Sequence, residues 1–254
     1  MKRVIKIGGR AQSAPDLAAR LAEAWKAAPK SFCLVHGGGD EISAMQRRVG
    51  SEPSFIGGRR ITTREDVEIV RMVLSGMVNK RLVSTLVAAG VPAVGISGED
   101  AGTIVATPID ADGLGRAGKP VSVNVDLIKT LLDAGFLPVI SPLASEEGGA
   151  PGEALNVNGD DVAAAIAIAM GGAELLLVAD VAGVLDGGGA PMSSIVPPEA
   201  SELIHHGVIS KGMRAKLEAG FAALTGGVGR VRISTLGGLS DPTEGTLLGL
   251  GLIT

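Results

Sequence analysis

Two clusters of glycine residues follow apolar runs at positions where they could bind an anion. Gly8-Gly9 follows residues 4–7, and Gly37-Gly38-Gly39 follows residues 32–35. In open α/β sheets, ligands bind beyond the carboxyl ends of the strands, and glycines there let backbone N–H groups come close to a phosphate. Either cluster alone could be only a tight turn. Two clusters at matching strand ends, one of them with Lys6 two residues upstream, favour an anion-binding site.

The usual nucleotide-binding fingerprints are missing or lie in the wrong context. The sequence has no G-x-x-x-x-G-K-[ST], so we do not expect a Walker-type phosphate loop. A G-x-G-x-x-G occurs at residues 113–118, but it follows Asp110-Ala111-Asp112 instead of an apolar strand. Pro120 also stands where the helix of a dinucleotide site would continue. We interpret this segment as a flexible loop.

Short apolar runs alternate with helical patterns along nearly the whole chain. Strands joined by crossover helices predict an α/β fold with a mostly parallel, doubly wound sheet. In the first helical stretch, Leu17, Leu21 and Trp25 form one face, and Ser13 stands where an N-cap is expected. Residues 50–62 and 97–120 are interpreted as hairpin or loop. The expected strands are 4–7, 32–35, 91–96, 137–140, 174–178 and 231–233, and the expected helices include 63–89 (with Gly76 as a point of interruption), 127–132, 160–170, 199–205 and 211–223.

The composition limits the classes of protein to which the chain can belong. Of its 254 residues 46% are hydrophobic but only 2% aromatic, so Ala, Val, Leu and Ile must build the core. A net charge of −4 without a run of Lys or Arg gives no sign of nucleic-acid binding. We see no signal peptide and no apolar stretch of the roughly 20 residues that a membrane span requires, and we expect a cytoplasmic protein. Cys33 lies in an apolar run and is interpreted as strand filler.

Five short motifs occur in a defined order along the chain. They are Lys6-Ile7-Gly8-Gly9, Val35-His36-Gly37-Gly38-Gly39, Asn156-Val157-Asn158-Gly159-Asp160, Asp180-Val181-Ala182-Gly183-Val184 and Gly212-Met213-Arg214-Ala215-Lys216. Each motif is weakly specific by itself, whereas five in order form a strong pattern. In order and spacing they resemble the amino acid kinase family, and within it the kinases of N-acetylglutamate most closely. The resemblance extends from residue 2 to about residue 235.

The resemblance implies a fold and an activity. The fold is a three-layer αβα sandwich with a mostly parallel open central sheet that continues through two lobes. Residues 1–150 would bind the amino-acid substrate and form a dimer, and residues 151–254 would bind ATP. The implied activity is transfer of the terminal phosphate of ATP to the side-chain carboxylate of N-acetyl-L-glutamate, giving N-acetylglutamyl 5-phosphate for arginine biosynthesis. Mg²⁺ would be bound mainly through the phosphates of ATP, without metal ligands supplied by the protein.

This chemistry requires charge compensation more than it requires a base. A carboxylate with a pKa near 4 is already ionised at pH 7, so the acceptor needs no deprotonation, which agrees with the presence of only three histidines. The difficulty is repulsion between the anionic acceptor and the γ-phosphate, and positioning with fixed positive charge must overcome it. By the family pattern, Lys6 and Lys216 would neutralise the transferring group. Asp160 would hold both lysines in place without accepting a proton.

The family pattern also implies which residues bind the two reactants. Arg60 would clamp the α-carboxylate of the acceptor through its forked guanidinium. Glycine N–H groups would donate hydrogen bonds to oxygens that gain charge in the transition state. The residues implied for the acceptor are Gly38, Gly39, Arg60 and Asn156, and those implied for the nucleotide are Gly8, Gly9, Asp180, Val181, Gly183, Leu185 and Gly212.

The three charged residues also have plainer interpretations. Lys6 could lie on an exposed sheet edge, although its neighbours are apolar and glycines follow it. Lys216 could be a solvated charge on a helix surface. Asp160 could serve only to stabilise a helix N-terminus, and Asp161 competes with it for either role.

The substrate-binding region leaves further points open. Arg60 has rivals in Arg59 and Arg64, and its position in the motif favours it. Two features depart from the family pattern. Ala179 stands where the family usually has Ser or Thr, and the loop at residues 52–57 lacks the lysines expected in close relatives. The first departure removes a hydroxyl contact to the nucleotide, and the second puts substrate affinity or identity in question.

We expect a homodimer that arginine does not inhibit. Arginine-inhibited members of the family carry an additional N-terminal helix, and here the first strand is expected to begin by about residue 3. The dimer interface is expected on the helix within 63–89, although its apolar faces could instead be ordinary core. The residues expected there are Val67, Val70, Met72, Val73 and Met77.

Two other functions fit the same fold. One is a kinase that acts on α-aminoadipate bound to a carrier protein in lysine biosynthesis, in which an arginine-rich surface would meet an acidic carrier. The other is a non-catalytic amino-acid sensor. The joint presence of Lys6, Asp160 and Lys216 argues against a sensor, because sensing needs no phosphoryl clamp.

Overall fold

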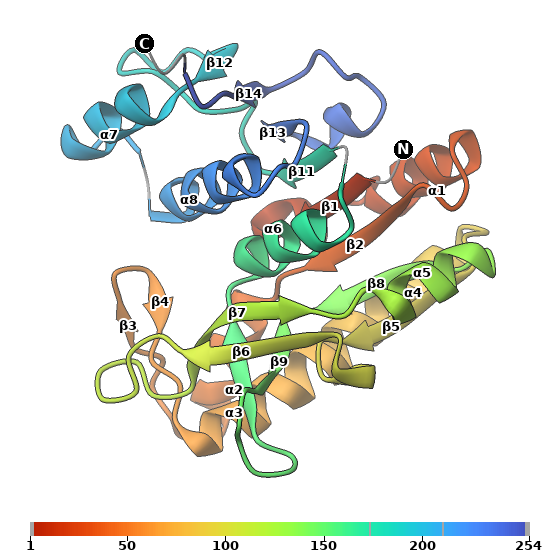
Figure 1. Ribbon diagram of the computed structural model, residues 1–254, viewed down its shortest axis with the longest axis vertical. Helices are drawn as coiled ribbons and strands as arrows, with labels where there is room; N and C mark the ends of the chain where they lie inside the picture. Colours follow the sequence, from red (N-terminus) through yellow and green to blue (C-terminus); the bar gives the residue numbers. More distant parts are fainter. Residues whose placement is uncertain (1–2, 173, 210, 252–254) are drawn as a thin grey trace.

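The computed structural model describes residues 3–172, 174–209 and 211–251, and its centre is one sheet of eight strands (Figure 1). These strands are β1 (Arg3–Ile7), β2 (Phe32–His36), β5 (Ala93–Ser97), β8 (Leu137–Ser141), β11 (Glu174–Val178), β12 (Ser194–Ile195), β13 (Val231–Ser234) and β14 (Thr246–Leu248). Their order is β12-β14-β13-β11-β1-β2-β8-β5. Every neighbouring pair is parallel except β13 with β14. The mostly parallel central sheet predicted from the sequence is confirmed.

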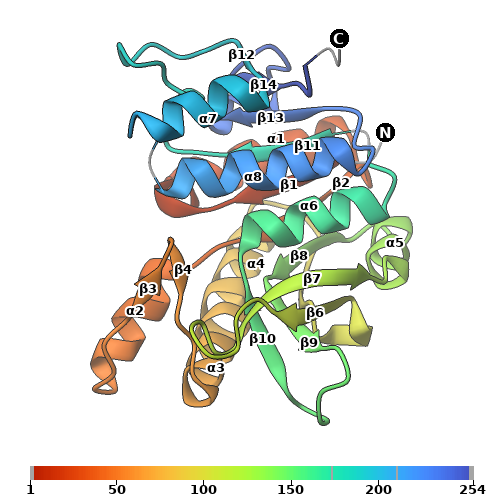
Figure 2. The same cartoon turned by 60° about the vertical axis from the view of Figure 1, so that its left-hand side comes forward.

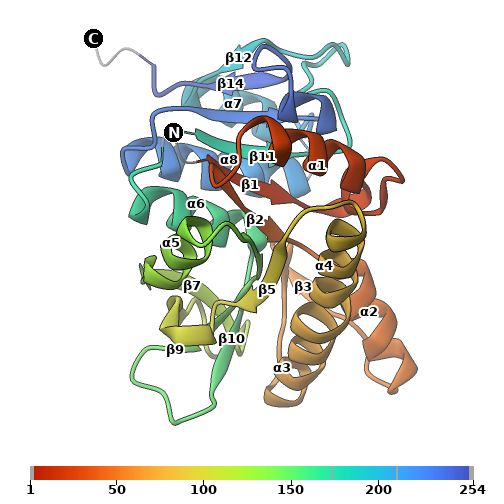
Figure 3. The same cartoon turned by 90° about the vertical axis from the view of Figure 1, so that its right-hand side faces the viewer.

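Helices cover both faces of this sheet and complete three layers (Figures 1 and 3). One face carries α1 (Leu17–Ala27) and α4 (Asn79–Ala88), and the other carries α5 (Asp126–Asp133), α6 (Gly159–Ala169) and α8 (Lys211–Thr225). The remaining helices are α2 (Gly39–Arg48), α3 (Arg64–Val70), α7 (Pro197–His205), the π-helix η2 (Arg71–Val78), and the 3₁₀-helices η1 (Gly9–Ser13), η3 (Asp100–Gly102) and η4 (Leu236–Leu239). Within the described ranges, no helix combines the length and the apolar character that crossing a lipid bilayer requires.

The central strands are buried on both sides, as expected for a parallel sheet between two helical layers. Every residue of β2, β8 and β11 is buried, including Cys33 in β2. Aliphatic side chains make up most of this core. Trp25 and Phe32 form an edge-to-face aromatic pair, with ring centroids 5.5 Å apart. The aliphatic interior predicted from the composition is confirmed.

The beginning of α1 differs from the sequence prediction. Leu17, Leu21 and Trp25 form its buried face as expected, but the helix begins after Asp16, not after Ser13. Ser13 belongs to the 3₁₀-helix η1, and Ala14, which precedes Pro15, has an extended ψ of 130°. A residue before proline is disfavoured in the α region, so the α-helix can start only after Pro15.

The helical stretch expected at 63–89 is a continuous rod of α3, η2 and α4. Its middle turns are π-helical over residues 71–78, so the interruption expected near Gly76 is present. Val67, Val70 and Val73 are buried in a second apolar cluster of the same chain, so these three residues are not available to a dimer interface. Met72 and Met77 are 56% and 46% exposed. The sequence pattern had placed all five of these side chains in one expected dimer interface.

Two small β-structures lie beside the central sheet, at the lower end in Figure 1. Strands β6 (Ile104–Pro108), β7 (Ala117–Val123), β9 (Leu143–Glu146) and β10 (Ala154–Val157) close into a four-stranded barrel. Strands β3 (Phe55–Ile56) and β4 (Arg59–Arg60) form a separate hairpin. The G-x-G-x-x-G segment forms the turn between β6 and β7 and the first residues of β7, where no helix follows a strand. That context excludes the dinucleotide-binding arrangement.

Candidate active site

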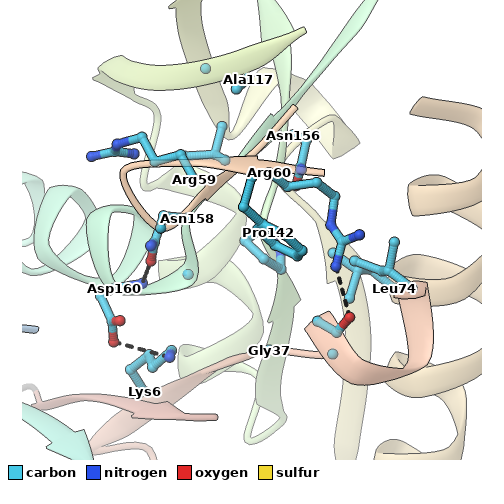
Figure 4. Close-up of a pocket in the computed structure, with 18 residues that line it drawn as sticks. Lys6, Gly37, Arg59, Arg60, Leu74, Ala117, Pro142, Asn156, Asn158 and Asp160 are labelled. Atoms are coloured by element: carbon cyan, nitrogen blue, oxygen red, sulfur yellow. Dashed lines mark hydrogen bonds and ion pairs between the residues drawn. The ribbon is translucent and has the colours of Figure 1, made fainter. Parts of the chain in front are cut away.

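Two adjoining cavities lie beyond the carboxyl end of β1. They share four lining residues: Lys6, Gly58, Asn158 and Asp160. The first cavity, of about 230 Å³, extends toward α2 and the β3–β4 hairpin, and the second, of about 350 Å³, extends toward α8. Figure 4 shows the first cavity, with Lys6 and Asp160 at its base and Arg60 on its opposite side. Two bound molecules could therefore meet at Lys6.

Lys6, Asp160 and Lys216 meet in one cluster, which we call the charge cluster. Both lysine Nζ atoms lie 3.0 Å from the same oxygen, Oδ1 of Asp160. All three side chains are nearly buried. Lys6 therefore does not lie on an exposed edge, and Asp160 does more than stabilise a helix end. Its rival Asp161 instead pairs with Arg59, at 3.0 Å.

Local geometry explains how three distant segments position this cluster. Lys6 is the fourth residue of β1, and Asp160 lies in the first turn of α6. Asn158 caps α6, because its side-chain oxygen accepts a hydrogen bond of 2.8 Å from the Asp160 N–H. Gly8 and Gly159 leave room for the lysine, since a Cβ at Gly8 would overlap Lys6 Nζ and one at Gly159 would lie 3.2 Å from Lys6 Cε. The motif glycines therefore make space for a cation as well as exposing backbone N–H groups.

Burial and mutual charge shift the pKa values of the cluster. Burial lowers the pKa of Lys6 to about 8, because loss of solvation and the nearby Lys216 outweigh the attraction of Asp160. Burial alone would raise the pKa of Asp160, but the two ammonium groups hold it below its ordinary value. Asp160 is therefore a carboxylate at neutral pH. The cluster carries a net positive charge wherever Lys6 is protonated.

Arg60 reaches the first cavity from β4 and is held in one orientation. Its Nη2 donates 2.8 Å hydrogen bonds to Gly39 O and Ser43 Oγ, and its Nη1 donates to Gln46 Oε1. Gln46 in turn donates a 2.6 Å hydrogen bond to Asp66. The side chain is 8% exposed, and its guanidinium lies 4.7 Å from the centre of the Phe55 ring. These three hydrogen bonds hold the guanidinium at the α2 side of the first cavity.

The rivals of Arg60 have other partners. Arg64 pairs with Glu153, and Arg59 pairs with Asp161. Figure 4 shows the guanidinium groups of Arg59 and Arg60 pointing in opposite directions. Of the three arginines, Arg60 is therefore the one whose guanidinium is held at the α2 side of the first cavity.

The sequence reasoning did not identify Gln46 and Asp66. If Arg60 binds the acceptor as the sequence predicts, we expect Gln46→Leu to raise the KM for that acceptor roughly tenfold, because a lost orienting hydrogen bond is worth about 1.4 kcal/mol. The kcat should change less than the KM. Steady-state titration of the acceptor measures both, and Arg48→Leu, an exposed site on the same helix, is the matched control. A variant that unfolds more easily but keeps its KM would limit the role of Gln46 to stability.

The other residues expected to contact the acceptor also line the first cavity. Gly38 has φ of +153°, a conformation that favours glycine, and a Cβ there would overlap Leu74 of the π-helix. Gly39 begins α2. Asn156 lies in β10 and donates a 3.0 Å hydrogen bond to Thr62 Oγ1. Each of the four residues predicted from the sequence therefore lies at this cavity.

His36 is a structural residue in this arrangement. It is completely buried at the end of β2, with Nδ1 2.8 Å from Gly37 O and Nε2 3.1 Å from Asn79 Nδ2. A hydrogen bond from Nδ1–H to the carbonyl leaves Nε2 to accept from the amide. Burial lowers the pKa of His36 to about 4. The ring is therefore neutral at physiological pH and fixes the turn that carries the glycines.

The residues predicted to contact the nucleotide divide into two groups. Gly8, Gly9, Asp180, Val181 and Gly212 line the second cavity, as does Ala179, which offers no hydroxyl. Gly183 and Leu185 are not part of that lining. Gly183 packs closely on Thr246, which accepts a 2.8 Å hydrogen bond from Val184 N, and Leu185 pairs with Pro191. These contacts fix the end of the loop that carries Asp180.

The chemistry of the lining residues suits phosphate oxygens better than a bare metal ion. Within the described ranges, no group of three or more His, Cys, Asp or Glu side chains is arranged to hold a metal. Mg²⁺ commonly keeps several waters and binds through one or two carboxylates together with substrate phosphates. Asp160 and Asp180 are the two carboxylates that line the second cavity.

The structure is thus an αβα sandwich in which a buried cluster of two lysines and one aspartate lies where two cavities adjoin. The chain belongs to the amino acid kinase family, whose model matches residues 1–234.

Three comparisons illustrate this relationship. The chain is 43% identical over 241 residues to the acetylglutamate kinase of Chloroflexus aurantiacus, covering 94% of this chain and 93% of that protein. It is 39% identical over 247 residues to the acetylglutamate kinase of Methanopyrus kandleri, covering 94% and 96%. Among solved structures, smu.665 from Streptococcus mutans superposes with a TM-score of 0.86 at 30% identity, covering 98% of each chain.

Proposed function

We propose that this protein transfers the γ-phosphoryl group of ATP to the side-chain carboxylate of N-acetyl-L-glutamate. The product would be N-acetylglutamyl 5-phosphate, an intermediate of arginine biosynthesis. The observation that carries this proposal is the charge cluster, which lies where the two cavities meet. The names of the relatives support the choice of acceptor.

The first cavity suits an acceptor with two carboxylates. Arg60 and Lys6 line it, and Figure 4 shows them on opposite sides. The guanidinium of Arg60 would bind the α-carboxylate, and Lys6 would attract the side-chain carboxylate toward the phosphoryl group. Asn156 and the backbone of Gly39 would orient the rest of the molecule. We propose that residues 1–150 supply most of this acceptor site.

The second cavity suits the phosphates of ATP. The backbone of Gly8 and Gly9 lines it together with Lys216 and the loop at Asp180. We propose that residues 151–254 hold the rest of the nucleotide. ATP would arrive with Mg²⁺, which supplies further positive charge on the phosphates.

The charge cluster would act by electrostatics in the transfer step. Lys6 and Lys216 would stabilise the negative charge on the transferring phosphoryl group from two directions. Asp160 would fix both ammonium groups before the reactants bind, so that little reorganisation is needed during the step. Because the acceptor carboxylate is already ionised, no group has to remove a proton.

The direct test is to trap the product. The purified protein with ATP, Mg²⁺ and N-acetyl-L-glutamate should give a hydroxamate when hydroxylamine is present, with one ADP formed for each hydroxamate. Acetyl-, succinyl- and free glutamate, aspartate and carrier-linked aminoadipate should be compared as acceptors. Faster turnover of carrier-linked aminoadipate than of N-acetyl-L-glutamate would show that the proposed acceptor is wrong. Binding without ADP formation would indicate a sensor.

The pKa of Lys6 predicts the pH dependence of the reaction. Because the pKa is lowered to about 8, kcat/KM for ATP should fall above that pH as Lys6 loses its proton. Between pH 8 and the ordinary lysine pKa, the unfolded chain binds more protons than the folded chain, so this group adds stability as the pH rises. The loss of activity should therefore occur without unfolding, which circular dichroism can check. An alkaline limit near pH 10 would contradict the prediction.

We also propose a homodimer in which a second copy covers part of the rod formed by α3, η2 and α4. Met72, Met77 and Val87 are about half exposed there. Met72→Glu combined with Met77→Glu should convert the dimer to monomer, because a charge would be buried in the interface. Sedimentation measures the change. Val121→Glu, at an exposed position on β7, is the control. A wild-type monomer would exclude the proposal.

A further inference from the structure

The turn of the β3–β4 hairpin lies over the junction of the two cavities. Gly58, in this turn, lines both cavities, and Phe55, Arg59 and Arg60 line the first. Figure 2 shows the hairpin rising from the lower half of the molecule with its turn directed toward α8. The turn therefore borders the space in which Lys6 and Asp160 of the charge cluster lie.

The contacts within the hairpin stabilise that position only weakly. Its strands are two residues long, with Phe55 paired to Arg60 and Ile56 to Arg59, and one further backbone hydrogen bond joins Ile61 N to Ser54 O. Phe55 and Ile56 are each 53% exposed, so little apolar area is buried. An isolated two-stranded hairpin is marginally stable in water at best. Arg60 anchors one strand to α2, which leaves the turn dependent on another contact.

Arg59 provides such a contact to the opposite half of the molecule. Its Nη1 donates a 3.0 Å hydrogen bond to Oδ2 of Asp161, a residue 102 positions away in the first turn of α6. The side chains are 31% and 19% exposed. Asp161 follows Asp160 directly in the sequence. The ion pair therefore connects the hairpin to the helix turn that carries the centre of the charge cluster.

We propose that Arg59 and Asp161 form a latch that holds the hairpin over the charge cluster and keeps water away from the transferring phosphoryl group. This inference rests on the proposed function. Water competes with the acceptor carboxylate for the phosphoryl group, and it also hydrolyses an acyl phosphate to carboxylate and inorganic phosphate. A closed hairpin limits both reactions and strengthens the electrostatic contacts of Lys6. Arg59 is thus a positioning residue, since its guanidinium is directed to Asp161 and away from Arg60.

Hydrogen exchange without any substrate tests the latch directly. In Arg59→Leu and in Asp161→Asn, the amides of residues 55–60 should exchange roughly two- to fivefold faster than in the wild type, the effect of losing a partly exposed ion pair. Arg59→Lys keeps the charge and should exchange at nearly the wild-type rate. Arg64→Leu breaks a different ion pair, with Glu153, and should leave residues 55–60 unchanged. Unchanged exchange in both latch variants would overturn the proposal.

The second measurement is the number of ATP molecules consumed for each hydroxamate trapped. The wild type should give a ratio near one, whereas Arg59→Leu and Asp161→Asn should raise it at least twofold through hydrolysis. If Arg59 instead held the acceptor, Arg59→Leu would raise the acceptor KM, while Asp161→Asn would not, and the ratio would stay near one. That result would overturn the latch. If the wild type forms no acyl phosphate, the proposed function fails, and the exchange experiment still decides the latch.

Discussion

Replacing Lys6 by methionine is expected to lower the kcat of phosphoryl transfer by roughly 10²–10³-fold, the range found when one preorganised donor to a developing charge is removed. Methionine has a similar length and suits the buried environment at the end of β1. The space beside Gly8 and Gly159 should stay filled, so the cavities should keep their shape. What is lost is the positive charge of a side chain that lines both cavities.

The hydroxamate assay at saturating ATP and acceptor measures this loss. Lys26→Met, at an exposed position in the last turn of α1, is the matched control and should leave kcat unchanged. Thermal unfolding should show that Lys6→Met is at least as stable as the wild type, because a buried charge is replaced by an apolar group, provided that Asp160 keeps its pairing with Lys216. Retention of more than a tenth of the wild-type kcat would remove Lys6 from the transfer step.

The parts of the fold that depend on burial could be predicted from the sequence. Strands β1, β2, β8 and β11 are continuous apolar runs because helices cover both faces of the sheet, and each was expected within a residue or two of its observed bounds. The glycine clusters were expected beyond β1 and β2, where the structure has them. In these cases neighbouring residues alone determine the local structure.

The features that depend on contacts between distant segments could not be predicted in this way. The barrel of β6, β7, β9 and β10 has strands of four to seven residues. Residues 97–120, which hold β6 and the start of β7, were interpreted only as hairpin or loop, and β9 and β10 were not among the expected strands. The π-helical turns at 71–78 have no simple periodic signature. Their position is explained by packing, since Leu74 and Val78 lie against Gly38.

The candidate site could likewise be predicted only in part from the sequence. The motifs pointed to Lys6, Asp160 and Lys216 because each belongs to one of the short glycine-containing motifs, and the structure brings all three together. The side chains that hold Arg60 carry no such signal. Gln46 lies in the last turn of α2, and Asp66 looks like an ordinary acid in the first turn of α3. The one sign of this arrangement in the sequence is that Gln46, a polar residue, lies on the apolar face of α2. Its partner Asp66 comes from α3, so the sequence of α2 alone does not explain it.

Asp160→Asn is expected to change both the rate and its pH dependence. The substitution keeps the shape of the side chain but removes the negative charge that lies 3.0 Å from each lysine Nζ. Two buried ammonium groups would then face each other without compensation, and the pKa of Lys6 should fall further below its present value of about 8. At pH 7 a large share of Lys6 would be neutral, and kcat should drop roughly 10²-fold.

The pH profile separates this role from that of a general base. If Asp160 positions the lysines, the alkaline limit of kcat/KM should move down by one pH unit or more, and activity should partly recover at pH 6, where Lys6 regains its proton. If Asp160 accepted a proton, activity would be lost at every pH and the alkaline limit would not move. The free energy of unfolding should fall by about 3–5 kcal/mol at neutral pH, the usual result of leaving buried charges unpaired. It should recover as the pH rises, because the unfolded chain then holds the proton that the folded Lys6 has released.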